Sequence, residues 1–225
     1  TYEPDYIANV EFGWKTQWLD NRLRWNGAAY HMSWTDMQHT RYDLAQYGSP
    51  VGLTVNVTEA EINGVETDIT FLIREGWTVA GGMAYNNAES TKAFAIGGKI
   101  APVGTRLPNV PKLKFNLNSR YNFELANQAA YVQAVYAFVD ESYDSLFAHP
   151  VGDASAELRE KQIDYTTVNL SAGIENDAWG IDLFVDNLLD ERAELTRGAQ
   201  GNSGWDSTIT ANRPRTLGIK YKMQF

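Results

Sequence analysis

The sequence lacks cysteine altogether, which fits an exported bacterial protein, although many soluble proteins share this absence. No apolar run approaches the roughly 18 residues that a membrane-spanning helix requires, so a transmembrane helix is excluded. Only three histidines occur, and the 19 Lys and Arg are outnumbered by 28 Asp and Glu. The resulting net charge of −9 argues against a general phosphate-binding face for nucleic acid. A soluble domain and a transmembrane β-barrel both remain compatible with these absences.

Aromatic residues, in contrast, are plentiful, with twelve Tyr, seven Trp and nine Phe. Barrels place such residues in girdles where the wall meets the lipid headgroups, although a large soluble sandwich would also use many of them. The end of the chain is more specific, because Leu217, Ile219, Tyr221, Met223 and Phe225 alternate with polar residues up to the last position. Outer-membrane barrels habitually end on such an apolar stripe.

The expected connections alternate strictly in length. Short turns are predicted at residues 20–21, 75–76, 126–127 and 176–177. Long stretches rich in Gly, Pro, Ser and Asn are predicted at roughly residues 37–58, 93–111, 144–163 and 192–212. This alternation is typical of an outer-membrane barrel, which has short turns on the periplasmic side and long loops outside.

Between these connections the sequence predicts about nine strands. They cover residues 5–19, 22–36, 59–74, 77–91, 112–125, 128–143, 164–176, 178–190 and 213–225. The clearest alternation lies in the fifth, where Leu113, Phe115 and Leu117 interleave with Lys112 and Lys114. One face is apolar and the other ionic, so we expect an all-β antiparallel transmembrane β-barrel with a polar lumen. An odd strand count cannot close such a barrel alone, so further strands must complete it.

Five sequence blocks carry a family resemblance over nearly the whole chain. They are NVEFGWK at 9–15 with the hairpin that follows it, AEINGVE at 60–66, LPNVP at 107–111, FVDNLLD at 184–190 and RPRTLG at 213–218. In this order they resemble the C-terminal part of the β-barrel of TonB-dependent outer-membrane receptors. The chain is therefore identified as a member of that family on the outer membrane of a Gram-negative bacterium.

The resemblance implies a 22-stranded barrel, of which these would be the last nine strands. Residues 1–225 would then be the C-terminal portion of the barrel, with the plug domain and the earlier strands absent. The sequence also opens at Thr1 without a signal peptide, so we expect a fragment of a longer protein.

The implied function is TonB-energised uptake of a scarce solute, with a ferric siderophore as the first choice. Cobalamin or a carbohydrate is an alternative cargo, and a passive porin or a scaffold in a larger envelope assembly is an alternative role. The implied partners are outer-membrane lipid, the TonB-ExbB-ExbD system acting through the missing part, the small-molecule ligand and the barrel-assembly machinery. That machinery would recognise an insertion signal at Gly218, Tyr221, Met223 and Phe225. No nucleic-acid partner is expected.

Ligand contacts are expected from loops and the upper lumen, because aromatic faces and a cation suit an iron chelate or another bulky solute. The candidates are Tyr42, Tyr47, Phe147, His149, Arg197 and Trp205. No Ser or Asp has a spacing that singles out a nucleophile or base, so no enzyme, cofactor or metal site is expected. Asn187 and Asp190 are interpreted as structural, hydrogen-bonding the backbone where the chain leaves the sheet.

Overall fold

The computed structural model describes residues 2–43, 51–96, 99–146, 161–200 and 206–223. Its elements are β1 (Tyr6–Trp18), β2 (Leu23–Asp43), β3 (Val51–Arg74), β4 (Trp77–Ser90), β5 (Phe94–Ile96), β6 (Lys99–Ala101), β7 (Leu113–Leu125), β8 (Gln128–Val139), β9 (Ser142–Tyr143), β10 (Lys161–Gln162), β11 (Tyr165–Glu175), β12 (Trp179–Asp186), β13 (Glu194–Gln200), β14 (Asp206–Ala211) and β15 (Thr216–Met223). Within these ranges no helix is long and apolar enough to cross a membrane.

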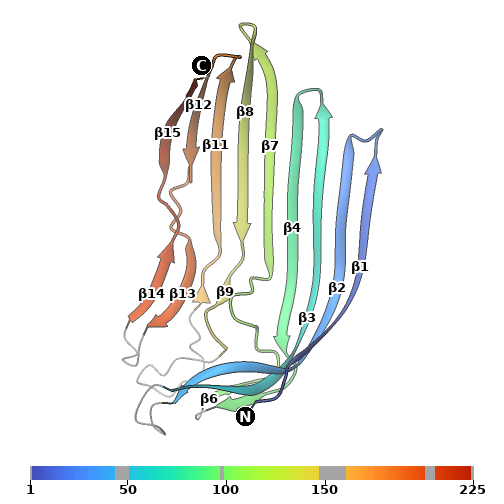
Figure 1. The fold of residues 1–225 in the computed structure, drawn as a ribbon, viewed down its shortest axis with the longest axis vertical. Helices are drawn as coiled ribbons and strands as arrows, with labels where there is room; N and C mark the ends of the chain where they lie inside the picture. Colours follow the sequence, from blue (N-terminus) through green and yellow to red (C-terminus); the bar gives the residue numbers. More distant parts are fainter. Residues whose placement is uncertain (1, 44–50, 97–98, 147–160, 201–205, 224–225) are drawn as a thin grey trace.

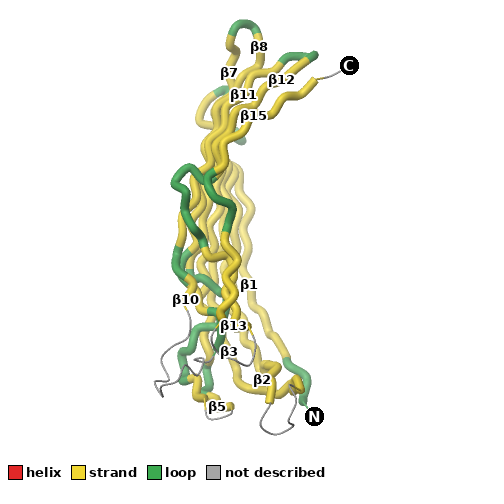
Figure 2. The backbone as a smooth tube through the Cα atoms, turned by 90° about the vertical axis from the view of Figure 1, so that its left-hand side faces the viewer, coloured by secondary structure: helices red, strands yellow, loops and turns green. Residues whose placement is uncertain are grey.

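Nine strands form one antiparallel sheet in the order β1-β2-β3-β4-β7-β8-β11-β12-β15, which is also their order along the chain (Figure 1). The sheet is a single curved layer with β1 at one edge, β15 at the other and the two chain ends at opposite ends of the strands (Figure 1). Turned by 90°, the long strands run the height of the molecule, and the short β5 lies at the end that carries the N-terminus (Figure 2). The predicted antiparallel sheet of nine wall strands is confirmed.

The short turns lie where the sequence predicts them. Ala126 and Asn127 join β7 to β8 with φ angles of 53° and 60°, the paired left-handed conformation of a two-residue hairpin turn. Gly76, at φ 76°, lies in the β3–β4 turn. Asn176 Oδ1 accepts the backbone N–H groups of Ala178 and Trp179 at 2.9 and 3.0 Å. Small or polar residues therefore close these hairpins tightly at one end of the sheet.

The pairing register divides the sheet into two chemically different faces. One continuous cross-strand row is almost entirely apolar and runs through Trp77, Tyr121, Val132, Ala172, Leu183 and Ile219. The adjacent row on the opposite face runs through Asn122, Tyr131, Gly173, Asp182 and Lys220. We call the first the apolar face and the second the polar face.

The apolar face exposes more apolar side-chain surface than a water-soluble protein normally does. Phe12 is 72% exposed, and Leu217 and Ile219 are each 74% exposed. Soluble proteins rarely expose contiguous apolar patches larger than a few hundred Å². An exposed apolar face opposite a polar one is typical of the wall of a transmembrane β-barrel, which turns its apolar face to lipid and its polar face to the lumen.

Strands β2 and β3 extend further than the sequence analysis expected. The prediction of a long loop over 37–58 is wrong for the described part, because β2 continues to Asp43 and β3 begins at Val51. The pairing shifts register between Trp34 and Gln38, where Asp36 has a φ of 55°. Asn56 Nδ2 donates to the Asp36 carbonyl at 2.6 Å and stabilises this bulge, beyond which pairing resumes.

The other three predicted loops also contain short strands. Residues 93–111 include the β5–β6 pair, residues 144–163 include β10, which pairs with β9, and residues 192–212 include the β13–β14 pair. A small apolar core forms where the long connections meet the sheet. Its buried members are Met37, Ala60, Ala88, Phe94, Ala101, Leu107 and Leu146. The connections are thus packed against the sheet at the end opposite the short turns.

Candidate functional site

The polar face carries a row of interacting side chains drawn from four strands. The Arg120 guanidinium carbon lies 3.7 Å from the Tyr131 ring centroid, and Arg120 Nη1 donates to Gln133 Oε1 at 2.8 Å. Tyr131 Oη donates to Asp182 Oδ1 at 2.8 Å, and Lys222 Nζ lies 3.7 Å from Asp182 Oδ2. Each group meets its partner through strand register. The result is a polar surface with fixed donors and acceptors, suited to contact with a polar solute or a polar protein surface.

A groove of about 840 Å³ lies on the polar face, over β1–β4, β7 and β8. Its charged lining includes Lys15, Glu66, Asp68 and Lys114. Asn26 Nδ2 donates to Asp68 Oδ2 at 3.0 Å, which orients that carboxylate. The mixture of carboxylate and ammonium groups can hydrogen-bond a ligand of either charge.

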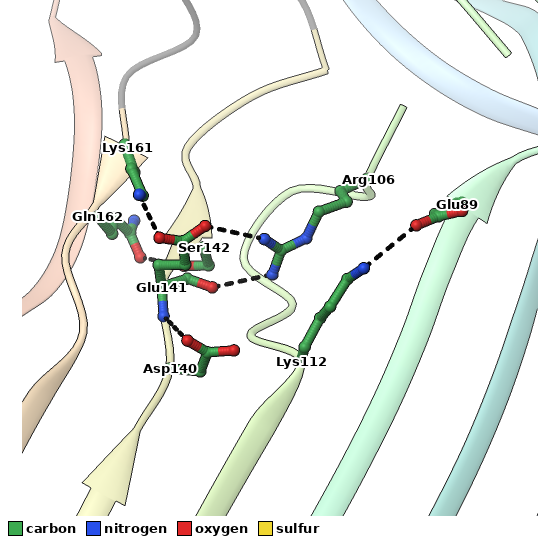
Figure 3. A network of polar contacts seen from close by, with 8 residues as sticks. All are labelled: Glu89, Arg106, Lys112, Asp140, Glu141, Ser142, Lys161 and Gln162. Carbon is green, nitrogen blue, oxygen red and sulfur yellow. Dashed lines mark hydrogen bonds and ion pairs between the residues drawn. The ribbon is translucent and has the colours of Figure 1, made fainter. Parts of the chain in front are cut away.

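The bases of two long connections, β4–β7 and β8–β11, are tied together by a second polar network (Figure 3). Arg106 Nη2 donates to the Glu141 carbonyl at 2.9 Å, while its Nη1 lies 3.4 Å from Glu141 Oε1. Lys161 forms an ion pair with the other carboxylate oxygen of Glu141. Beside this pair, Ser142 Oγ donates to Gln162 Oε1 at 2.8 Å. These contacts hold the bases of the two connections together.

Three ionisable groups near the end of the sheet opposite the short turns have perturbed pKa values. The hydrogen bond with Glu141 raises the pKa of Lys161, so this ammonium stays charged. Burial lowers the pKa of His39, which favours its neutral form. The backbone N–H of Arg215 lowers the pKa of Asp190, and the nearby positive charge of Arg215 acts in the same direction. At Lys161 and Asp190 the shift favours the charged form, which is the form that contacts Glu141 and Arg215.

Asn187 and Asp190 form a backbone clamp, as the sequence analysis predicted. The Asn187 side chain accepts the Glu191 N–H at 3.0 Å and donates to the carbonyls of Glu191 and Arg213 at 2.9 and 3.0 Å. Asp190 Oδ1 accepts the Arg215 N–H at 2.9 Å. Both residues adopt positive φ angles, 51° and 53°. The clamp therefore joins the end of β12 to the start of β15, and the structural interpretation is confirmed.

The candidate ligand residues are only partly within the described structure. Tyr42 lies near the end of β2, and Arg197 lies in β13. Arg197 makes a two-point contact with Glu194, with Nε–Oε2 at 3.1 Å and Nη2–Oε1 at 2.8 Å. Tyr47, Phe147, His149 and Trp205 lie outside the described residues. The ligand role of all six residues stays a prediction.

Three members of the expected insertion signal lie in β15, and Phe225 lies outside the described residues. Tyr221 and Met223 point to the apolar face, opposite Ile181 and Trp179. Gly218 lies on the polar face beneath Phe184, and a Cβ at this position would overlap the Phe184 ring. This close approach gives a packing reason for glycine at 218. The recognition role stays a prediction.

The structure adds two features that the sequence analysis missed. These are the row from Arg120 to Lys222 and the base network around Arg106 and Glu141. The alternation in each strand identified the polar positions but gave no cross-strand partners. Across the described ranges, no group of three His, Cys, Asp or Glu side chains is arranged to hold a metal ion.

Comparison with known proteins identifies the family. A family model described as "TonB dependent receptor-like, beta-barrel" matches residues 2–188. The probable TonB-dependent siderophore receptor PiuA of Acinetobacter baumannii is 29% identical over 125 residues, covering 53% of this chain and 16% of the relative. The metal-pseudopaline receptor CntO of Pseudomonas aeruginosa is 29% identical over 199 residues, covering 85% of this chain and 24% of the relative.

Solved structures show the same fold. The ferric yersiniabactin uptake receptor FyuA of Yersinia pestis matches with a TM-score of 0.73 at 21% identity, covering 98% of this chain and 30% of that structure. The chain thus spans less than a third of the length of these proteins. They are receptors rather than enzymes, in agreement with the expectation that this chain is not an enzyme. The chain belongs to the TonB dependent receptor-like β-barrel family, whose members lie in the outer membrane of Gram-negative bacteria.

Proposed function

We propose that residues 1–225 form the last nine strands of a 22-stranded receptor barrel. The family match over residues 2–188 supports this most directly. In the described sheet, β1 and β15 are edge strands that pair on one side only. Lipid cannot satisfy the free backbone groups of an edge, so partner strands must complete the wall. The proposal places these strands, the plug domain and the TonB-interacting segment in the remainder of a longer protein.

The proposed activity of the whole protein is TonB-energised uptake of a scarce solute, namely a ferric siderophore or a related metal chelate. The names of PiuA, CntO and FyuA support this class of cargo. The polar face supports passage of a hydrated, hydrogen-bonding solute, because its charged groups line the lumen side of the wall. The proposed partner is TonB with ExbB and ExbD.

A small polar pocket marks where this part of the wall would meet the solute. It has a volume of about 390 Å³ and lies beside the Asn187 clamp, at the loop end of β11, β12 and β15. Its lining includes Thr167, Asn169, Asp186 and Thr216. These side chains offer both donors and acceptors on the polar face.

Uptake measurements test the activity. The full-length receptor is expressed in cells stripped of their own siderophore receptors, and entry of radioactive iron is measured with a panel of ferric siderophores, with and without TonB. Uptake that requires both the receptor and TonB is expected. Receptor-dependent entry of small sugars without TonB would identify a passive porin and overturn the proposal. TonB-dependent uptake of cobalamin or an oligosaccharide alone would overturn the choice of cargo.

A matched pair of variants tests the pocket. Asp186→Ala removes a pocket carboxylate and is expected to raise the solute concentration at half-maximal uptake several-fold. Asp177→Ala removes an exposed carboxylate from the short turn after β11 and is expected to leave uptake unchanged. Equal effects of the two substitutions would exclude a role of the pocket in solute contact.

A further inference from the structure

The apolar face contains a groove as well as a flat lipid-facing wall. The groove has a volume of about 990 Å³ and crosses β4, β7, β8, β11, β12 and β15. Small side chains, Ser119, Ala134 and Ala172, form its floor, and larger ones such as Leu183 and Ile219 line it further along. Six adjacent strands span about 24 Å at ~4.8 Å per step. The groove is therefore about as long as one extended hydrocarbon chain.

One end of the groove carries a positive charge at the level of the short turns. Arg74 is the last residue of β3, and its guanidinium carbon lies 5.0 Å from the Tyr121 ring centroid and 5.7 Å from the Trp77 ring centroid. Trp77 is itself fixed, because its Nε1 donates to Ser119 Oγ at 3.0 Å. Arg74 is exposed, and no residue in the described part of the chain accepts a hydrogen bond from its guanidinium. Its donors are thus free for an external anion.

The path of the groove leads from the headgroup level into the membrane. Trp77 directly follows the β3–β4 turn, whereas Val132 and Ile219 on the same cross-strand row lie further from the turn end of their strands. In a barrel whose strands tilt by roughly 35–45°, a row perpendicular to the strands rises obliquely through the wall. A lipid with its phosphate at Arg74 would therefore place an acyl chain in the hydrocarbon core.

We propose that this groove holds one glycerophospholipid of the periplasmic leaflet, with its phosphate on Arg74 and one acyl chain along the groove. The charge of Arg74 and its level in the membrane both point to this occupant. The guanidinium matches a phosphate, the short turns define the periplasmic side, and the lining of the groove is predominantly apolar. The inference depends on the membrane location of the chain and is independent of which solute is transported.

Native mass spectrometry of the full-length receptor tests this site. The receptor is purified in detergent, stripped of loosely held lipid and titrated with palmitoyl-oleoyl phosphatidylglycerol. The first phosphatidylglycerol molecule to bind is expected to be retained more tightly than the molecules that bind after it. Dioleoylglycerol, which has the chains without the phosphate, is expected to bind more weakly.

Two variants address the two ends of the groove. Arg74→Gln removes the charge and is expected to weaken retention roughly fivefold, the effect of one cation near an anionic headgroup. Ala134→Leu fills the floor and is expected to weaken retention on the order of tenfold, as if about two methylenes were excluded. The matched control is Ala29→Leu, the same change on the apolar face of β2 outside the groove, and it is expected to retain the lipid. Folding is checked by the compact migration of unheated receptor on SDS gels.

Equal retention by wild type, Arg74→Gln and Ala134→Leu would overturn the proposal. It would also be overturned if the tightly held molecule were lipopolysaccharide, or if the groove were covered by a second receptor in a dimer that Ala134→Leu dissociates. Arg74 is exposed, so loss of folding is not expected in Arg74→Gln, and that variant alone keeps the test decisive.

Discussion

Replacing Asn187 by alanine should loosen the connection between β12 and β15. The Asn187 side chain is 5% exposed and makes three hydrogen bonds to backbone groups of Glu191 and Arg213. At about 1 kcal/mol for each bond, their loss costs about 3 kcal/mol. The left-handed backbone at Asn187 disfavours alanine by about 1 kcal/mol more. The expected local destabilisation is about 4 kcal/mol.

Hydrogen exchange of the full-length receptor measures this change directly. The Glu191 amide donates to Asn187 Oδ1, so its exchange reports opening of the clamp. Exchange should accelerate roughly a thousandfold in Asn187→Ala, because about 4 kcal/mol corresponds to nearly three powers of ten. Asn187→Asp keeps the acceptor but aims a carboxylate at two carbonyl oxygens, so acceleration is expected there as well.

Asn212→Ala is the matched control for the clamp. Asn212 Oδ1 accepts one backbone N–H, from Ala193, at 3.2 Å. Its loss should cost about 1 kcal/mol and accelerate local exchange only about fivefold. Equal exchange of the Glu191 amide in wild type and Asn187→Ala would refute the assignment of the clamp.

Three further changes test the turn, the charge and the wall. Ala126→Gly should stabilise the barrel by about 1 kcal/mol, because alanine is strained at a φ of 53°; the midpoint of urea unfolding in detergent measures it. Because the folded pKa of Asp190 is lowered, its stabilisation should be present above the unfolded pKa of about 3.9 and be lost as pH falls through the folded value. Hydrogen exchange of the Arg215 amide should thus differ between wild type and Asp190→Asn near neutral pH and converge in acid. Ile219→Lys should destabilise the inserted barrel by roughly 2–4 kcal/mol by placing a charge in lipid, and the yield of folded receptor in vesicles measures this loss.

Much of the fold could be predicted because its signals are local. The turn at Ala126 and Asn127 and the alternation in residues 113–125 are both visible in short windows of sequence. The extension of β2 and β3 was missed because a bulge at Asp36 restores pairing beyond an apparent break, and only the partner strand shows this. The polar network around Arg106 and Glu141 could not be predicted either, because these residues lie 35 positions apart in the sequence and meet only in the folded connections.

The candidate ligand site could be predicted less well, because loop composition gives no contacts. Arg197 was chosen as a cation for a ligand, yet it lies in a hairpin and contacts Glu194 through two hydrogen bonds. Its charge is thus already engaged. A sequence reveals that a charged side chain is present, but only the structure shows whether a neighbour has neutralised it.

Because side chains alternate along a strand, neighbouring residues of the sheet contact different surroundings. On β11, Ala172 faces the groove on the apolar face, while Gly173, the next residue, lies on the polar face beneath Tyr131. A larger side chain at 172 fills the groove, whereas one at 173 would displace Tyr131 from its contacts with Arg120 and Asp182. Lipid retention and solute uptake should therefore respond independently to substitutions one residue apart, because each strand presents successive side chains to different solvents.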